Sequence, residues 1–155
     1  MDTWLPADFE HPAFVALDGE AHLRPIRAAD ADIDMIAVMS HRRMLWEIYG
    51  EAWGWPPAGM TREQDEEDLA RHAREMVEHR SFNYAVLASD ESALYGCVYI
   101  DPVETEDAPN AAEVSWWVIP SAPASVRRDL DAFVPRWLAS SWPFAEIRYP
   151  FNDAA

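Results

Sequence analysis

Lysine is absent from this chain of 155 residues, and cysteine and glycine are scarce. All twelve basic residues are arginine, so the chain can form no lysine Schiff base and carries no P-loop lysine. The single cysteine, Cys97, excludes an internal disulfide and a cysteine-rich zinc site. No apolar run approaches the roughly 18 residues of a membrane-spanning helix, and the acidic N-terminal segment is unlike a signal peptide. We therefore expect a cytoplasmic protein.

The chain has 28 acidic residues against 12 basic ones, which gives it a formal net charge of -16. Such a charge repels nucleic acid and anionic membranes, so we expect neither as a partner. Half of the residues are hydrophobic, which suffices for an ordinary core. The length predicts a single domain over residues 1–155.

The first half of the chain is predicted to contain a hairpin and two helices. The turn dipeptide Asp18-Gly19 separates two extended segments, 13–17 and 20–26. Asp30 is expected to cap a helix with apolar residues at helical spacing as far as Met44. The aromatic, proline-interrupted stretch 50–60 is interpreted as a connection.

A second helix is predicted from a capping-box pattern, Thr61 followed by Gln64, and is expected to run to about Arg80. Its inner face is expected to carry Leu69, Ala73, Met76 and Val77.

The second half is predicted to contain a three-stranded meander, a helix and a final strand. The strands cover 82–88, 93–101 and 112–119, with an acidic loop at 102–110 before the third. Ser125 is expected to cap a helix to about Ser140, in which Pro135 should cause a kink or an early end of regular hydrogen bonding. The last strand is expected at 144–151. This order indicates an α+β fold with helices on a mostly antiparallel sheet.

Five segments then reveal a family resemblance: 22–26 (HLRPI), 28–32 (AADAD), 84–87 (YAVL), 94–100 (LYGCVYI) and 112–120 (AEVSWWVIP). Together they resemble the GNAT superfamily of acetyl-CoA-dependent N-acetyltransferases. The resemblance implies helices on both faces of the sheet, with an extra N-terminal hairpin strand and a shortened C-terminus. It also implies transfer of an acyl group from acetyl-CoA to an amine, either a small molecule or a peptide.

In that family the strand corresponding to 112–119 pairs through its backbone with the pantetheine of CoA, and an Arg/Gln-x-x-Gly-x-Gly/Ala loop follows. A register set from Leu130 places Ala122, Ser125 and Arg127 at the three signature positions. Each side chain there crowds a phosphate that approaches backbone amides closely. The guanidinium groups of Arg127 and Arg128 can hold phosphate instead, or form a solvated basic turn on a degenerate site. The resemblance thus implies an acetyl-CoA site at Trp117, Val118, Ile119, Ser125, Val126, Arg127 and Arg128.

Catalytic candidates lie on the same two strands. Some relatives carry a catalytic glutamate where Glu113 stands, so this residue is the candidate general base. Family members often take a general-acid tyrosine from a later helix, which we expect this chain to lack. A proton donor would then come from Tyr95, Tyr99 or Cys97, which share one face of a strand by alternation. Cys97 is also a candidate acyl-transfer nucleophile, although a thiol on an apolar strand is commonly inert.

Aromatic residues are expected to line the acceptor groove, where they would hold an apolar or cationic acceptor. They are Tyr49, Trp53, Trp55 and Tyr84, and packing that caps the core explains them equally well. His72, Glu75 and His79 stand at helical spacing compatible with metal ligation, but the pattern matches no standard metalloenzyme motif. We interpret it as a surface helix without metal.

Three functions therefore remain open. The first is an active N-acyltransferase. The second is a GNAT-fold protein that has lost catalysis and binds a small molecule or a protein, and the third is a module that forms a homodimer through an exposed last strand.

Overall fold

The computed structural model describes residues 4–103 and 109–152. Within these residues the strands form one sheet in chain order, and neighbours are antiparallel except for the parallel pair β5 and β6. The α+β class and the mostly antiparallel sheet are therefore confirmed. The strands are β1 (Val15–Ala16), β2 (Ala21–Pro25), β3 (Phe82–Ala88), β4 (Leu94–Pro102), β5 (Ala111–Val118) and β6 (Glu146–Arg148).

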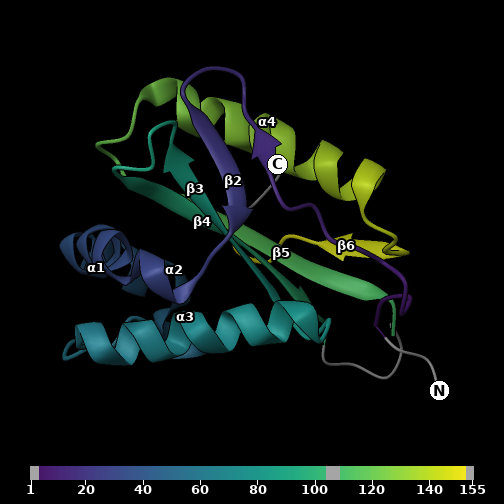
Figure 1. Ribbon diagram of the computed structural model, residues 1–155, viewed down its shortest axis with the longest axis horizontal. Helices are drawn as coiled ribbons and strands as arrows, with labels where there is room; N and C mark the ends of the chain where they lie inside the picture. Colours follow the sequence, from purple (N-terminus) through teal and green to yellow (C-terminus); the bar gives the residue numbers. More distant parts are fainter. Residues whose placement is uncertain (1–3, 104–108, 153–155) are drawn as a thin grey trace.

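Helices cover both faces of the sheet, as Figure 1 shows. One face carries α1 (Ala31–Ser40), α2 (Arg42–Trp53) and α3 (Arg62–Val77), and the other carries α4 (Ala124–Ser141). Side chains of β5 alternate between the two layers: Ser115 accepts a hydrogen bond from Tyr49 of α2, and Trp116 donates one to Asp131 of α4. No helix in the described part of the chain has the length and apolarity needed to cross a bilayer.

The first predicted helix is wrong in extent, since it is two helices. α1 ends where the His41 N–H bonds to the Val38 carbonyl, and α2 continues to Trp53. Gly54 then adopts a left-handed conformation with φ of 62° and ends the helix. The first residues of the predicted connection at 50–60 are therefore helical.

The second predicted helix is confirmed at its start, because Thr61 and Gln64 form the reciprocal capping box. Leu69 and Met76 are buried as expected, but Val77 is 79% exposed because it lies at the C-terminal end of α3.

The C-terminal elements also differ from prediction. α4 starts after Pro123, which makes no side-chain cap, so Ser125 lies inside the helix. The helix passes through Pro135 and continues to Ser141. The last strand contains only residues 146–148, since the flanking residues do not pair with β5. Residues 104–108 of the acidic loop lie outside the described residues.

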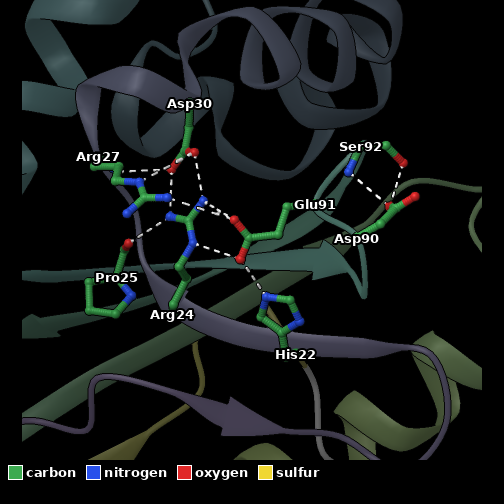
Figure 2. A network of polar contacts seen from close by, with 8 residues as sticks. All are labelled: His22, Arg24, Pro25, Arg27, Asp30, Asp90, Glu91 and Ser92. Carbon is green, nitrogen blue, oxygen red and sulfur yellow. Dashed lines mark hydrogen bonds and ion pairs between the residues drawn. The ribbon is translucent and has the colours of Figure 1, made fainter.

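A buried ion-pair network fixes β2 against the start of α1 and the β3–β4 turn (Figure 2). Arg24 donates two hydrogen bonds to Asp30, at 2.8 and 2.9 Å, and two to Glu91, both at 3.0 Å. His22 Nε2 lies 2.7 Å from Glu91 Oε2. Asp30 therefore does not cap α1 with its side chain as expected, because its carboxylate receives Arg24 and the backbone N–H of Arg27.

Candidate active site

A cavity of about 840 Å³ lies between the helical layer of α1, α2 and α3 and one end of the sheet, where β3 and β5 begin and β4 ends. We term it the α3 cavity. Its wall carries six carboxylates and two arginines, so its charge is predominantly negative. The acidic residues are Asp34, Asp65, Asp68, Glu75, Asp101 and Glu113.

An aromatic cluster forms one side of the α3 cavity. Trp53 is 43% exposed and stacks on Tyr49, with ring centroids 4.4 Å apart. Trp55, Tyr99 and Phe151 complete the wall. Tyr49 itself is fully buried behind Trp53, and burial raises the pKa of its hydroxyl well above the ordinary value. The structure thus brings three of the four predicted groove residues together.

The fourth predicted groove residue, Tyr84, lies on the opposite face of the sheet. Its ring packs edge-on against Trp137 of α4, at 5.0 Å between centroids, and its hydroxyl donates to the Pro12 carbonyl. A strand places neighbouring residues on opposite faces, so it is Asn83, next to Tyr84, that lines the α3 cavity.

Two of the candidate catalytic side chains line this cavity. Glu113 is half-buried on β5, between Asp101 of β4 and Arg148 of β6 in the strand register. The Tyr99 hydroxyl accepts a hydrogen bond from Trp117 Nε1 at 2.8 Å, and a second side-chain hydrogen bond joins it to the Cys97 thiol. Burial raises the pKa of Tyr99 well above its usual value, so the phenol is protonated at neutral pH.

Cys97 is 1% exposed and is not among the residues that line the α3 cavity. Burial raises the pKa of its thiol well above the ordinary value, which disfavours the thiolate needed for nucleophilic attack. Tyr95 is half-buried on the same strand, and its carbonyl accepts the Ile119 N–H.

The free edge of β5 is bridged by a side chain. β6 pairs with β5 only as far as Glu113 and Arg148. Beyond that point the Asn152 carboxamide accepts from the Trp116 N–H at 2.8 Å and donates to the Trp116 carbonyl at 2.9 Å. Val118 presents its N–H and C=O to the same edge, because backbone groups alternate along a strand. The backbone groups on this edge of β5 therefore hydrogen-bond an amide in the way that they would bond a neighbouring strand.

A second cavity, of about 690 Å³, lies where β5 leads into α4. We term it the α4 cavity. Val118, Ile119, Arg127 and Arg128 line it, beside a helix start whose N–H groups have no side-chain cap. A helix N-terminus with two guanidinium groups is suited to an anion such as phosphate.

The other three predicted cofactor residues lie elsewhere. Val126 is 3% exposed in the core, and Trp117 points to the opposite face to meet Tyr99. Ser125 is not among the residues of the α4 cavity.

His72 of α3 and His79, which follows the end of α3, do not converge on one point. His72 Nδ1 lies 3.6 Å from Glu75 Oε1 in the α3 cavity, whereas the His79 ring lies 6.1 Å from the Phe9 ring and 6.2 Å from the Phe82 ring. Among the described residues no group of three or more side chains is arranged to hold a metal ion.

Sequence reasoning missed the buried acids of the α3 cavity. Asp34 and Asp65 are 4% and 3% exposed, although each stands in a helical first turn that suggests solvated charge. The helical spacing of Asp65, Leu69 and Met76 was the available signal, since it places the acid on the inner face. The sequence offered no signal for the contact between Asn152 and Trp116, which depends on how the chain turns after β6.

Solved acetyltransferase structures share this fold at low sequence identity. One is the ribosomal L7/L12 alpha-N-protein acetyltransferase RimL in complex with coenzyme A, with a TM-score of 0.61 and 12% identity over 80% of this chain and 67% of that chain. A second is the ribosomal-protein-S5-alanine acetyltransferase from Vibrio fischeri, with a TM-score of 0.55 and 17% identity over 84% and 67%. A third is the microcin C7 self-immunity acetyltransferase MccE with acetyl-CoA and AMP, with a TM-score of 0.63 and 8% identity over 84% and 69%.

The architecture is thus that of acetyltransferases, and this chain spans about two thirds of the length of the three structures. A family model described as an acetyltransferase (GNAT) domain matches residues 21–125. The chain belongs to the GNAT acetyltransferase family. A search of curated protein sequences finds no significant match.

Proposed function

We propose that the protein is an N-acetyltransferase that transfers the acetyl group of acetyl-CoA to an amine. The amide recognition at Trp116 carries this proposal. The Asn152 carboxamide accepts a hydrogen bond from the Trp116 N–H and donates one to the Trp116 carbonyl, and an amide-containing pantetheine chain has the same donors and acceptors, which supports the proposal.

The residues present fit the cofactor at both of its ends. Trp116 and Val118 would pair with the pantetheine amides along β5, and Arg127 and Arg128 would hold phosphate in the α4 cavity. The bound cofactor supplies an activated acyl group as a thioester. The glycines usual in the phosphate loop are replaced here by side chains, so the arginines carry more of the phosphate binding than backbone amides do.

Glu113 and Tyr99 divide the proton transfers. An acceptor amine enters as an ammonium ion through the acidic α3 cavity, and Glu113 removes its proton directly or through one water. Tyr99 remains protonated because of its burial, and Trp117 fixes the orientation of its hydroxyl. It can therefore donate a proton to a departing thiolate.

Cofactor affinity tests the proposal through Asn152. Asn152→Ala removes the carboxamide that competes for Trp116; its two hydrogen bonds are worth about 1 kcal/mol each, so acetyl-CoA should bind roughly 30-fold more tightly. Asn110→Ala is the matched control, because Asn110 also bridges backbone groups, those of Trp4 and Ala145, but where the β5–β6 pair begins, at the opposite end from Trp116. Calorimetry that detects no binding to wild type or to Asn152→Ala at millimolar acetyl-CoA would refute the proposal.

Turnover tests the catalytic roles. Glu113→Gln is expected to lower kcat by roughly 100-fold at neutral pH and to leave acetyl-CoA affinity unchanged. The assay follows thiol release with a panel of amines. Wild-type protein that binds acetyl-CoA but acetylates none of them would indicate a binding module instead.

A further inference from the structure

The Asn83 side chain brings an unpaired oxygen to the wall of the α3 cavity. The residue is only 4% exposed, and within the described part of the chain its Oδ1 accepts no hydrogen bond. A buried carboxamide oxygen destabilises the fold unless a donor reaches it. The cavity therefore has a place for a hydrogen-bond donor next to Asn83.

The strand register places a carboxylate close to this oxygen. Asn83 of β3 pairs with Tyr99 of β4, and Asp101 follows two residues further along β4. Alternate residues of a strand point to one face, and Asn83 and Asp101 both line the α3 cavity. They form a diagonal pair across neighbouring strands, with a backbone separation of about 7–8 Å and a smaller one between their Cβ atoms. Because charge-assisted hydrogen bonds are about 2.8 Å long, one nitrogen atom can bridge the oxygens of the two side chains.

Glu113 stands beside the same position. It pairs directly with Asp101 across β4 and β5, and such residues have Cβ atoms about 5 Å apart. Ser81 Oγ donates to Asp101 Oδ1 at 2.6 Å and so holds this carboxylate next to the start of β3. The candidate general base is therefore the neighbour of the carboxylate that lies beside Asn83.

The three side chains specify the chemistry of the missing donor. The Asn83 oxygen and the ionised carboxylates of Asp101 and Glu113 are all acceptors, and together they carry negative charge. A primary ammonium group has three donors, no acceptor and a positive charge. It therefore matches this set better than a hydroxyl group, which has one donor and is neutral.

We propose that Asn83 and Asp101 hold the nitrogen of the acceptor beside Glu113, and that they select a primary amine over its N-methyl derivative. A primary ammonium donates one hydrogen bond to each of the three side chains. After Glu113 has taken one proton, the neutral amine keeps two N–H groups for Asn83 and Asp101, and its lone pair is left for the acyl carbon. An N-methyl amine has one N–H group fewer at both stages. The inference rests on the proposed function for the reaction that follows; the binding of the amine stands on the cavity.

Calorimetry with two ligands tests the proposal on the full chain without acetyl-CoA. Octylamine and N-methyloctylamine carry the same alkyl chain, for which Trp53, Trp55 and Phe151 provide an apolar wall. Both carry one positive charge, so the general attraction of cations to an acidic protein cancels in the comparison. The additional charge-assisted hydrogen bond should make octylamine bind about 10-fold more tightly. Equal affinity of the two ligands would overturn the proposal.

Variants of Asn83 assign the preference to its oxygen. Asn83→Leu keeps a side chain of similar size without an acceptor, so it should weaken octylamine about 10-fold, leave N-methyloctylamine nearly unchanged and abolish the preference. Asn83→Asp keeps an oxygen acceptor at this place and should keep the preference. The control is Ser115→Ala, which removes a buried hydroxyl from the same face of the sheet but outside the cavity wall. A preference that is lost in both Asn83→Leu and Ser115→Ala, or in neither, contradicts the proposal.

The stability of the free protein gives a readout without any amine. Asn83→Leu removes an unpaired buried oxygen, so its midpoint of urea unfolding should rise above that of wild type. Ser115→Ala removes the acceptor of the Tyr49 hydroxyl and should lower the midpoint. A lower midpoint for Asn83→Leu would mean that the chain itself supplies a donor to Asn83, and the proposal would fail.

A crystal structure with octylamine provides a readout that does not depend on affinity. The nitrogen is expected within hydrogen-bond distance of Asn83 Oδ1 and of the Asp101 carboxylate. A water molecule bound at Asn83 with the amine elsewhere would refute the assignment.

Acetyl transfer, assayed separately, distinguishes this inference from the proposed function. Transfer to octylamine and N-methyloctylamine with equal kcat/KM removes only the inference. A binding preference for octylamine without transfer to any amine supports the inference and removes only the proposed function.

Discussion

The stability of the fold should depend strongly on Arg24, and Arg24→Leu is the perturbation that tests this. The substitution removes four hydrogen bonds to two carboxylates and leaves Asp30 buried without its bidentate partner. The side chains of Arg24 and Asp30 are 11% and 5% exposed, so solvent cannot replace the lost contacts.

The expected cost follows from that burial. Removing one partner of a buried ion pair costs about 3–5 kcal/mol. Glu91 adds little to this, because its side chain is 32% exposed and water recovers part of the interaction. Asp30 keeps the hydrogen bond from the Arg27 N–H, which places the cost near the lower end of the range. At about 2–4 °C per kcal/mol for a chain of this size, Tm should fall by roughly 10 °C.

Urea unfolding monitored by tryptophan fluorescence measures the effect, with Arg27→Leu as the control. Arg27 belongs to the same network but is 60% exposed, and its guanidinium lies 3.7 Å from Glu91 and 4.0 Å from Asp30, so its loss should cost less than about 1 kcal/mol. The double variant Arg24→Leu, Asp30→Asn should recover part of the loss, because no buried unpaired charge remains at residue 30. A cost below about 1 kcal/mol for Arg24→Leu, or additive effects in the double variant, would refute the reasoning.

Three further predictions concern the turn, the sheet and a helix start. Arg24 and His22 lower the pKa of Glu91 from 4.5 to about 2. The contribution of Glu91 to the stability of the fold is therefore complete above pH 4.5 and is lost as the pH falls towards 2. In acid titrations, the difference in unfolding free energy between wild type and Glu91→Gln should shrink over that pH range. Gly96→Ala places a Cβ 1.9 Å from the Trp117 carbonyl oxygen and should cost about 2 kcal/mol or more in urea unfolding, and an unchanged midpoint would contradict this close approach. Thr61→Ala removes the cap of α3 and should cost about 1 kcal/mol, whereas Thr61→Ser should restore most of it.

Local sequence patterns were sufficient to predict an element wherever that element depends on residues that are close together in the chain. The alternation in 82–88 and 112–119 predicted β3 and β5, and the pair Thr61 and Gln64 predicted the start of α3, because pleating and capping act over a few residues. Segments with competing local signals were less predictable. Asp30 has the residue type of a helix cap, but its carboxylate is taken by Arg24 from another strand, a contact that only the tertiary structure provides.

The candidate site shows the same division. The sequence by itself determined the family resemblance, and this resemblance implied the candidate base Glu113 and the pair Arg127 and Arg128, which line the α3 and α4 cavities; strand alternation left the candidate proton donor open among Tyr95, Tyr99 and Cys97. Only the tertiary structure decided that Tyr84 faces α4, that Asn152 bridges Trp116, and that Asp34 and Asp65 are buried around one cavity. These outcomes depend on which elements pack together, and burial of a charged group is set by distant neighbours that a local pattern does not contain.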